Sequence, residues 1–260
     1  RWFDHWLNDG KNGITEEAPV RIFVMGDDVW REEQEWPLAR AQESKYYLHS
    51  GGKANSTNGD GSLGTDGPQA EPPDVFLYNP ADPVPTTGGA LCCNPYYAAN
   101  GAYDQNEVEE RQDVLVYSTP PLERDVEVTG PVTVTLWAST SATDTDFTAK
   151  LVDVCENGCA RNLTDGIIRA RYRDSMSNPT LLEPGRAYCY EIDLWATSNV
   201  FKAGHRIRLE ISSSNFPRFD RNLNTGHVPG LDADMQVARQ TIYHNTTHPS
   251  HVMFPMIPRR

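Results

Sequence analysis

The chain has 260 residues, of which 38% are hydrophobic and 10% aromatic, and its formal net charge at pH 7 is −13. This composition supplies ample apolar side chains for one large β-domain or two small ones. The acidic balance, without any cluster of basic residues, argues against a nucleic-acid partner. No run approaches the ~18 consecutive apolar residues that cross a bilayer, so we expect a soluble protein without a membrane partner.

The first residues predict a short helix, because four large apolar side chains recur on one helical face. These are Trp2, Phe3, Trp6 and Leu7. Residues 20–25 then read as a strand that is apolar on both faces, which is typical of a sheet covered on both sides, as in α/β folds. We therefore expect residues 1–36 to be the last helix and strand of a larger α/β domain. Within them, residues 28–36 are expected to form a connector.

From residue 37 onward the pattern changes. Residues 50–74 are rich in Gly, Ser, Asn, Thr and Pro, which predicts a long loop. Downstream, apolar and polar residues alternate with period 2, and this alternation predicts strands over 132–136, 168–173, 188–194 and 206–211. Strands with one wet face and long connections favour a jelly roll over a compact immunoglobulin-like domain. The expected fold over residues 37–260 is a mainly β, antiparallel jelly-roll sandwich.

The five cysteines are an odd number, whereas a disulfide-stapled secreted scaffold would be shorter and evenly paired. We therefore favour a cytoplasmic location over secretion. Cys155 and Cys159 bracket an Asn-Gly turn, so their thiols can face each other across a hairpin, and whether they are bridged stays open. No second CxxC or histidine pair stands at ligand spacing, so neither a metal nor a cofactor is expected.

No catalytic residue is predicted in this chain. A serine hydrolase needs a nucleophile, a histidine base and an orienting acid, and α/β-hydrolases place the serine in G-x-S-x-G. The nearest string, residues 60–64, lacks the first glycine. Asp4 and His5 are adjacent and point about 100° apart on a helix, so they cannot pair with each other. The other histidines considered are interpreted as structural: His205, His244, His248 and His251.

The densest polar segment, residues 212–222, follows a predicted core strand. Two interpretations of it stay open. Its side chains can brace one loop through mutual and backbone hydrogen bonds, which is favoured, or they can line a sugar- or peptide-binding cleft. The residues concerned are Asn215, Arg218, Asp220 and Asn222.

Several longer strings carry a resemblance to one family. They lie at residues 1–7, 20–26, 30–31, 78–85, 88–89, 144–154, 163–167, 196–199, 204–207, 212–217 and 248–251. Together they resemble the C-terminal part of the cocaine esterase/X-Pro dipeptidyl-peptidase-like (CocE/NonD) hydrolases, over essentially the whole chain.

The resemblance implies an α/β-hydrolase catalytic domain with a helical cap, followed by a galactose-binding-like jelly roll. Residues 1–36 would then be one helix and one strand left over from the catalytic domain. In the family the catalytic serine, aspartate and histidine precede this helix, so none is carried over onto the chain. The implied partners are the missing N-terminal catalytic domain and a small ester, amide or peptide substrate, and a homo-oligomer is also considered.

The resemblance further implies a role for the segment after Gly88-Gly89. In cocaine esterase-like members this segment lends apolar side chains to the acyl pocket, and here it reads Leu91-Cys92-Cys93. Two small thiols would make that pocket roomier and argue against a benzoyl preference. The alternative to this function is a stand-alone galactose-binding-like module that recognises sugar or peptide.

Overall fold

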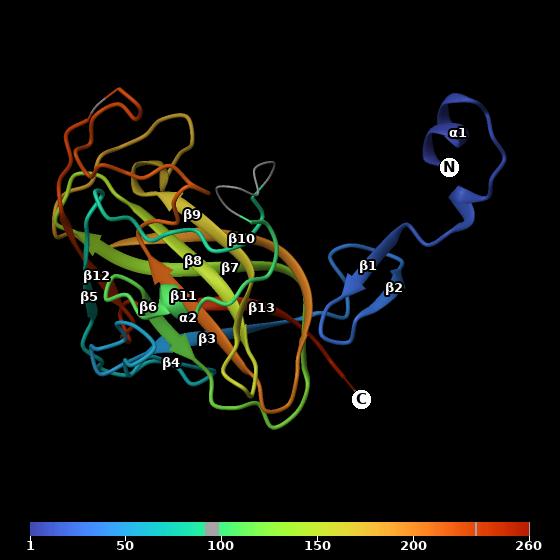
Figure 1. Ribbon diagram of the computed structural model, residues 1–260, viewed down its shortest axis with the longest axis horizontal. Helices are drawn as coiled ribbons and strands as arrows, with labels where there is room; N and C mark the ends of the chain where they lie inside the picture. The colour runs from blue at the N-terminus through green and yellow to red at the C-terminus, as the bar shows by residue number, and fades with distance from the viewer. Residues whose placement is uncertain (92–98, 232, 260) are drawn as a thin grey trace.

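The computed structural model describes residues 1–91, 99–231 and 233–259. A large β-sandwich fills one side of the molecule and a small N-terminal segment projects from it, as Figure 1 shows. Within the described residues the main sheet has eleven strands. They are β3 (Gln42–His49), β4 (Ser62–Gly64), β5 (Asp74–Tyr78), β6 (Leu115–Ser118), β7 (Val126–Thr140), β8 (Asp146–Val154), β9 (Ala160–Arg169), β10 (Tyr188–Phe201), β11 (Arg206–Ser212), β12 (Ala238–Tyr243) and β13 (His251–Ile257).

The strands pair in the order β5–β12–β7–β13–β3–β4–β6–β11–β8–β9, and β10 also pairs with β7. Among these described strands every pair is antiparallel except β4–β6, which meet in parallel at Ser62 and Ser118. The long strand β7 serves as the centre of one layer, since β10, β12 and β13 all bond to it. The expectation of a mainly β, antiparallel sandwich is confirmed.

The core lies between the two layers. Side chains from one layer meet those of the other in a single buried cluster, which includes Val134 of β7, Ile192 of β10, Leu151 of β8 and Leu209 of β11. Period-2 alternation produces this arrangement because every second side chain of a strand faces inward. Each large apolar side chain buried here contributes about 1.5–3 kcal/mol.

The N-terminal segment contains α1 (Trp2–Leu7), η1 (Ile14–Glu16), β1 (Val20–Val24) and β2 (Val29–Glu33). The predicted helix and first strand are therefore present. The prediction of a connector over 28–36 was wrong, because β2 pairs antiparallel with β1 in a two-stranded hairpin. The hairpin reaches the sandwich at Met25, whose N–H donates to the Ser198 carbonyl over 3.0 Å and whose carbonyl accepts from Val200 over 2.8 Å.

Two further local predictions hold for only part of their range. The expected strand 168–173 stops at Arg169 and continues as the short helix η2 (Ala170–Tyr172). The chain turns there because Arg171 bonds Asp144 through both its backbone N–H and its guanidinium. The expected loop 50–74 contains β4, which pairs with β3.

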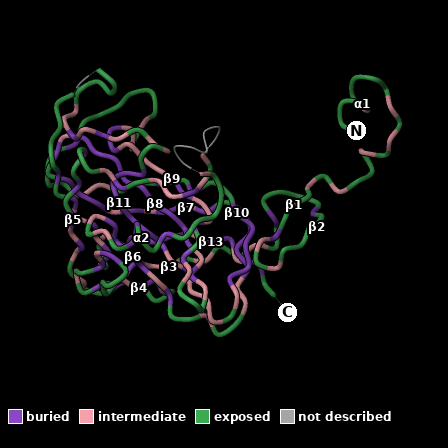
Figure 2. Tube along the Cα trace, in the orientation of Figure 1, coloured by how far each residue is buried: buried purple, intermediate pink, exposed green. Residues whose placement is uncertain are grey.

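Side-chain exposure separates the two parts of the molecule. Figure 2 shows buried residues concentrated in the sandwich and the N-terminal segment mostly exposed or intermediate. The apolar face of α1 is open: Trp2, Phe3, Trp6 and Leu7 are 61%, 72%, 56% and 74% exposed. In the described part of the chain, no helix has both the length and the apolar character that crossing a membrane requires.

Candidate functional site

The four polar side chains predicted from the segment after β11 separate into two groups. Asn215 and Arg218 both turn to Asp165 on β9. The Asn215 Nδ2 atom donates to Asp165 Oδ2 over 3.0 Å, and Arg218 Nε donates to Asp165 Oδ1 over 2.8 Å. The Asp165 and Arg218 side chains are 7% and 12% exposed, so solvent screens this ion pair weakly.

The residues on either side of Asp165 fix β9 against β10. The Thr164 hydroxyl donates to the Leu194 carbonyl. Gly166 lies so close to β10 that a Cβ atom would stand 2.0 Å from the Asp193 carbonyl oxygen, so a side chain does not fit there. Because side chains alternate along a strand, Asp165 points to the opposite side from Thr164 and is free to meet the loop.

Thr86 joins the same group from a distant part of the chain. Its hydroxyl donates to Asn215 Oδ1 over 2.7 Å and accepts from the Arg218 backbone N–H over 3.1 Å. Its own N–H donates to the Phe216 carbonyl over 2.7 Å. The loop after β11 and the segment that leads to Gly88-Gly89 therefore lie side by side.

The Gly88-Gly89 pair turns the chain beyond Thr86. Both residues have positive φ, 68° and 92°, a conformation that L side chains rarely adopt. Gly89 and Gly101 exchange two backbone hydrogen bonds of 2.7 and 3.0 Å. The next carbonyl, that of Ala90, accepts from Arg218 Nη1 over 2.6 Å. Leu91, the first residue of the predicted pocket edge, follows and is half-buried. Cys92 and Cys93 lie outside the described residues.

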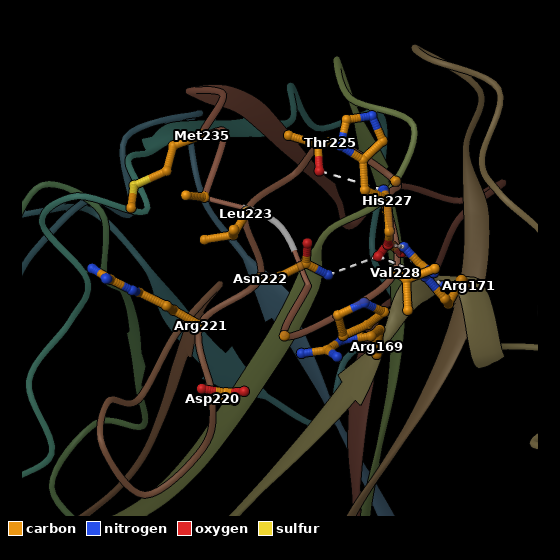
Figure 3. Close-up of a pocket in the computed structure, with 15 residues that line it drawn as sticks. Arg169, Arg171, Asp220, Arg221, Asn222, Leu223, Thr225, His227, Val228 and Met235 are labelled. Carbon is orange, nitrogen blue, oxygen red and sulfur yellow. Dashed lines mark hydrogen bonds and ion pairs between the residues drawn. The ribbon is translucent and has the colours of Figure 1, made fainter.

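The other two predicted residues, Asp220 and Asn222, line a separate cavity of ≈ 280 Å³. Figure 3 shows Asn222 between two arginines on one side and the apolar Leu223 and Met235 on the other. The arginines are Arg169 and Arg171. The sequence-predicted cluster is thus divided between a bonded group at Asp165 and this cavity.

The polar groups at the base of the cavity are bonded mostly to one another. Asn222 Nδ2 donates to Asp144 Oδ2 over 2.9 Å and to Asp146 Oδ1 over 2.8 Å. Arg169 pairs with Asp146 through two hydrogen bonds, and Arg171 pairs with Asp144. Burial raises the pKa of Asp146, although Arg169 opposes that effect. Few donors are therefore left at the base to orient a ligand.

A buried charged network lies behind the Gly88-Gly89 turn. Lys150 Nζ donates to Gln105 Oε1 over 2.7 Å and to Glu210 Oε2 over 2.9 Å. Gln105 in turn donates to the Thr87 carbonyl over 2.9 Å and immediately precedes the short helix α2 (Asn106–Glu109). Burial and the neighbouring Glu210 carboxyl raise the pKa of Glu109 to about 8. The Arg208 guanidinium, which donates to Glu109 Oε2, opposes this rise.

His244 resembles the base of a catalytic triad by distance alone. Its Nε2 lies 3.1 Å from Ser50 Oγ, and its Nδ1 lies 3.2 Å from Glu71 Oε2. However, Asp74 Oδ2 also lies 2.9 Å from Nε2 and accepts the Ser50 hydroxyl proton over 2.7 Å. The Ser50 hydroxyl proton is therefore directed at Asp74 and not at His244. This cluster is an ion network and not a nucleophile with its base.

The remaining candidate histidines also have local partners. His5 Nδ1 lies 3.0 Å from the Gly10 carbonyl, His205 Nδ1 lies 2.8 Å from Asp153, and His248 packs its ring on Trp137. Across residues 1–91, 99–231 and 233–259, no group of three His, Cys, Asp or Glu side chains stands in position to hold a metal ion.

The question of a bridge between Cys155 and Cys159 is answered by the structure, in which both are free thiols. They lie across the turn between β8 and β9, where the Cys155 N–H donates to the Cys159 carbonyl over 2.9 Å. Burial raises the pKa of the Cys155 thiol, which favours its neutral form.

Sequence reasoning missed Asp165 and Thr86 as members of the group around Arg218. Asp165 lies 53 residues from Arg218 along the chain, so no local spacing connects them. The available signal was the charged residue itself, which stands between the apolar residues Leu163 and Ile167. A carboxylate at such a position needs a buried partner.

The comparisons with known proteins assign the family. Residues 12–253 match the model of the X-Pro dipeptidyl-peptidase C-terminal non-catalytic domain. The chain belongs to this family. Membership confirms the resemblance to CocE/NonD hydrolases seen in the sequence. The similarity to the cocaine esterase of Rhodococcus sp. (strain MB1 Bresler) is 47% identity over 260 residues, which cover 99% of the chain and 45% of that esterase.

Two solved structures resemble this family member over almost its whole length. An α-amino acid ester hydrolase gives a TM-score of 0.84 at 29% identity, covering 98% of this chain and 43% of the hydrolase. An aminopeptidase from a marine sediment archaeon, Thaumarchaeota archaeon, gives a TM-score of 0.83 at 28% identity, covering 99% of this chain and 43% of the peptidase. The chain spans less than half of the length of these relatives.

Proposed function

We propose that the chain is the C-terminal, non-catalytic part of a longer serine hydrolase that acts on small esters, amides or peptides. The family match and the hydrolytic names of its relatives support this class. In this proposal residues 1–36 complete the preceding catalytic domain and residues 37–260 form the accompanying jelly roll. The preceding domain carries the nucleophile and its base, and the chain supports that domain.

The observation that carries the proposal is the uncovered apolar surface of the N-terminal segment. Four large side chains of α1 are more than half exposed, and Trp30 of the hairpin is 62% exposed. Each such side chain forgoes about 1.5–3 kcal/mol of burial. Trp2 packs on Trp6 within α1, and Trp30 packs on Phe23 within the hairpin. Exposed apolar patches of this kind mark contact surfaces. The part of the relatives that this chain does not match supplies a partner of suitable size.

A finer part of the proposal places Leu91, Cys92 and Cys93 at the edge of the acyl pocket. Its support is the resemblance through Gly88-Gly89, together with the hydrogen bonds that hold Gly89 and Ala90. Small thiols at this edge leave more room than bulky apolar residues. We therefore expect a weaker preference for benzoyl esters than in a hydrolase whose pocket edge carries bulky apolar residues.

Serine labelling tests the proposal directly. The native protein and the isolated 260-residue chain are each treated with a fluorophosphonate, and each is assayed with a p-nitrophenyl ester. The native protein is expected to take up one label and to turn over the ester, with the label on a serine that precedes this chain. Stoichiometric labelling of a serine within the chain, accompanied by turnover, would contradict the proposal.

A second candidate function rests on the cavity of Figure 3. A stand-alone galactose-binding-like module would use Asp220 and Asn222 to hold a sugar or a peptide. Titration of the chain with simple sugars and short peptides, followed by calorimetry, separates the two candidates. Saturable binding that is lost in Asp220→Ala supports the binding-module function. The hydrolase proposal does not require the chain to bind sugars or peptides.

A further inference from the structure

We propose that Arg218 and Asp165 are a positioning pair for the backbone that leads into Leu91. The inference rests in part on the proposed function, since it names the residues that would hold the pocket edge in place. Arg218 reaches two acceptors at once: Nε donates to Asp165 Oδ1 over 2.8 Å and Nη1 donates to the Ala90 carbonyl over 2.6 Å. Ala90 directly precedes Leu91.

The shape of the guanidinium makes this contact directional. The group is planar and its N–H bonds form a rigid fork, so an ion pair on one edge fixes the direction of the neighbouring N–H. Asp165 therefore decides where Arg218 Nη1 points, and Nη1 decides where the Ala90 carbonyl lies. A lysine at this position has a single ammonium on a flexible stem and cannot set two directions together.

The pair is itself held in a closed circuit of hydrogen bonds. Asn215 donates to the second oxygen of Asp165, Thr86 donates to Asn215, and the Arg218 backbone donates to Thr86. These hydrogen bonds restrain the four residues relative to one another. Its members come from β9, from the loop after β11 and from the segment before Gly88-Gly89. The segment before Gly88-Gly89 and the positioning pair are therefore both held to β9.

Arg221 offers a matched control in the same loop. Its Nη1 donates to the Pro80 carbonyl over 3.0 Å, and its guanidinium lies 5.6 Å from the centre of the Phe216 ring. It therefore also ties the loop to a backbone carbonyl, but at a point well before Gly88-Gly89 in the chain. A general loosening of the loop would follow from either arginine, whereas displacement of Ala90 follows only from Arg218.

The first test measures backbone exchange in the native protein with Arg218→Lys and Arg221→Lys. Both variants keep the positive charge beside the loop. The Gly89 amide, which donates to Gly101, is followed by hydrogen-exchange mass spectrometry. Loss of a charge-assisted bond is expected to speed its exchange about tenfold or more in Arg218→Lys, while Arg221→Lys leaves it unchanged. Equal exchange in both variants, or an unchanged rate in Arg218→Lys, would overturn the positioning pair.

The second test measures acyl selectivity in the same proteins. Arg218→Lys is expected to change the ratio of kcat/KM for a benzoyl and an acetyl ester about fivefold, through KM, while Arg221→Lys leaves that ratio unchanged. Faster Gly89 exchange without a change in selectivity would uphold the pair and contradict the pocket-edge role. Asp165→Asn, which keeps an acceptor oxygen but removes the charge, is the second variant and should give smaller changes of the same kind.

Discussion

His244 is fully buried between Asp74 and Glu71, so its protonation contributes to the stability of the sandwich. Burial alone would lower the pKa of His244, but the hydrogen bonds and charges of the two carboxylates raise it above its usual value. Replacing His244 with Gln leaves Asp74 buried without its cationic partner. We expect the free energy of unfolding, measured by urea titration at pH 6, to fall by roughly 3–5 kcal/mol.

The pH dependence of this loss has a definite sign. Because the folded pKa of His244 is raised, its contribution is complete below the unfolded value of about 6.5 and is lost as pH rises through the folded value. The difference between the wild type and His244→Gln should therefore shrink at alkaline pH. His248→Gln is the control, since His248 packs on the rings of Trp137 and Tyr243. A difference that grows with pH would contradict this account.

Glu109 gives a second pH-dependent prediction. Burial and Glu210 raise the pKa of Glu109 from 4.5 to about 8, although the Arg208 guanidinium opposes them. Between these two pH values the folded Glu109–Glu210 pair holds a proton that the unfolded chain releases. That contribution is complete below about pH 4.5 and is lost as pH rises through about 8. Glu109→Gln imitates the protonated form. The variant should match the wild type near pH 5 and exceed it by roughly 1–3 kcal/mol at pH 9 in urea titrations. Greater stability of the wild type at pH 9 would refute this assignment.

At the scale of elements, Gly26 allows the β1–β2 hairpin to approach the sandwich closely. Gly26 has φ +81°, and a Cβ atom there would stand 2.2 Å from the Val200 carbonyl oxygen. Gly26→Ala should therefore separate Met25 from β10 and destabilise the protein by roughly 2–4 kcal/mol. Gly13 is the matched control, because it also has positive φ but a Cβ there meets nothing within 4 Å.

Hydrogen exchange at the Val200 amide measures the contact between the hairpin and β10, because that amide donates to the Met25 carbonyl. Gly26→Ala should speed its exchange, whereas Gly13→Ala should cost only about 1–2 kcal/mol of backbone strain and leave the Val200 rate unchanged. Equal effects of the two substitutions would mean that backbone strain, and not the close approach, controls the hairpin.

Strands of the sandwich could be predicted from the sequence wherever one face of the strand is buried and the other is exposed to solvent. Val132, Val134 and Leu136 show this alternation and are all fully buried on β7. β2 escaped prediction because its sequence, Val-Trp-Arg-Glu-Glu, carries charges on both faces of a hairpin that is mostly exposed. The end of β9 escaped for a different reason. Arg171 continues the alternation in sequence, yet its pairing with Asp144 turns the chain into η2.

At the scale of the whole molecule, the sequence singled out the loop after β11 but not the contacts that the loop makes. Asn215 and Arg218 were singled out by their density in a polar segment, which is a local property. Their common partner Asp165 and the contact with Ala90 depend on strands and loops distant in sequence that fold together. Register and layer packing create such contacts, and a single sequence contains no direct record of either.

The apolar face of α1 leads to a prediction about the isolated 260-residue chain. Without a covering domain, Trp2, Phe3 and Trp6 stay in water, and association hides them at a gain of about 1.5–3 kcal/mol per side chain. Light scattering should show a mass that rises with protein concentration. The triple change of these residues to Ser should restore a constant monomer mass. Leu77→Ser is the control, because Leu77 is 62% exposed on β5 and lies outside this face. A wild-type chain that stays monomeric at every concentration would show that the face needs no partner.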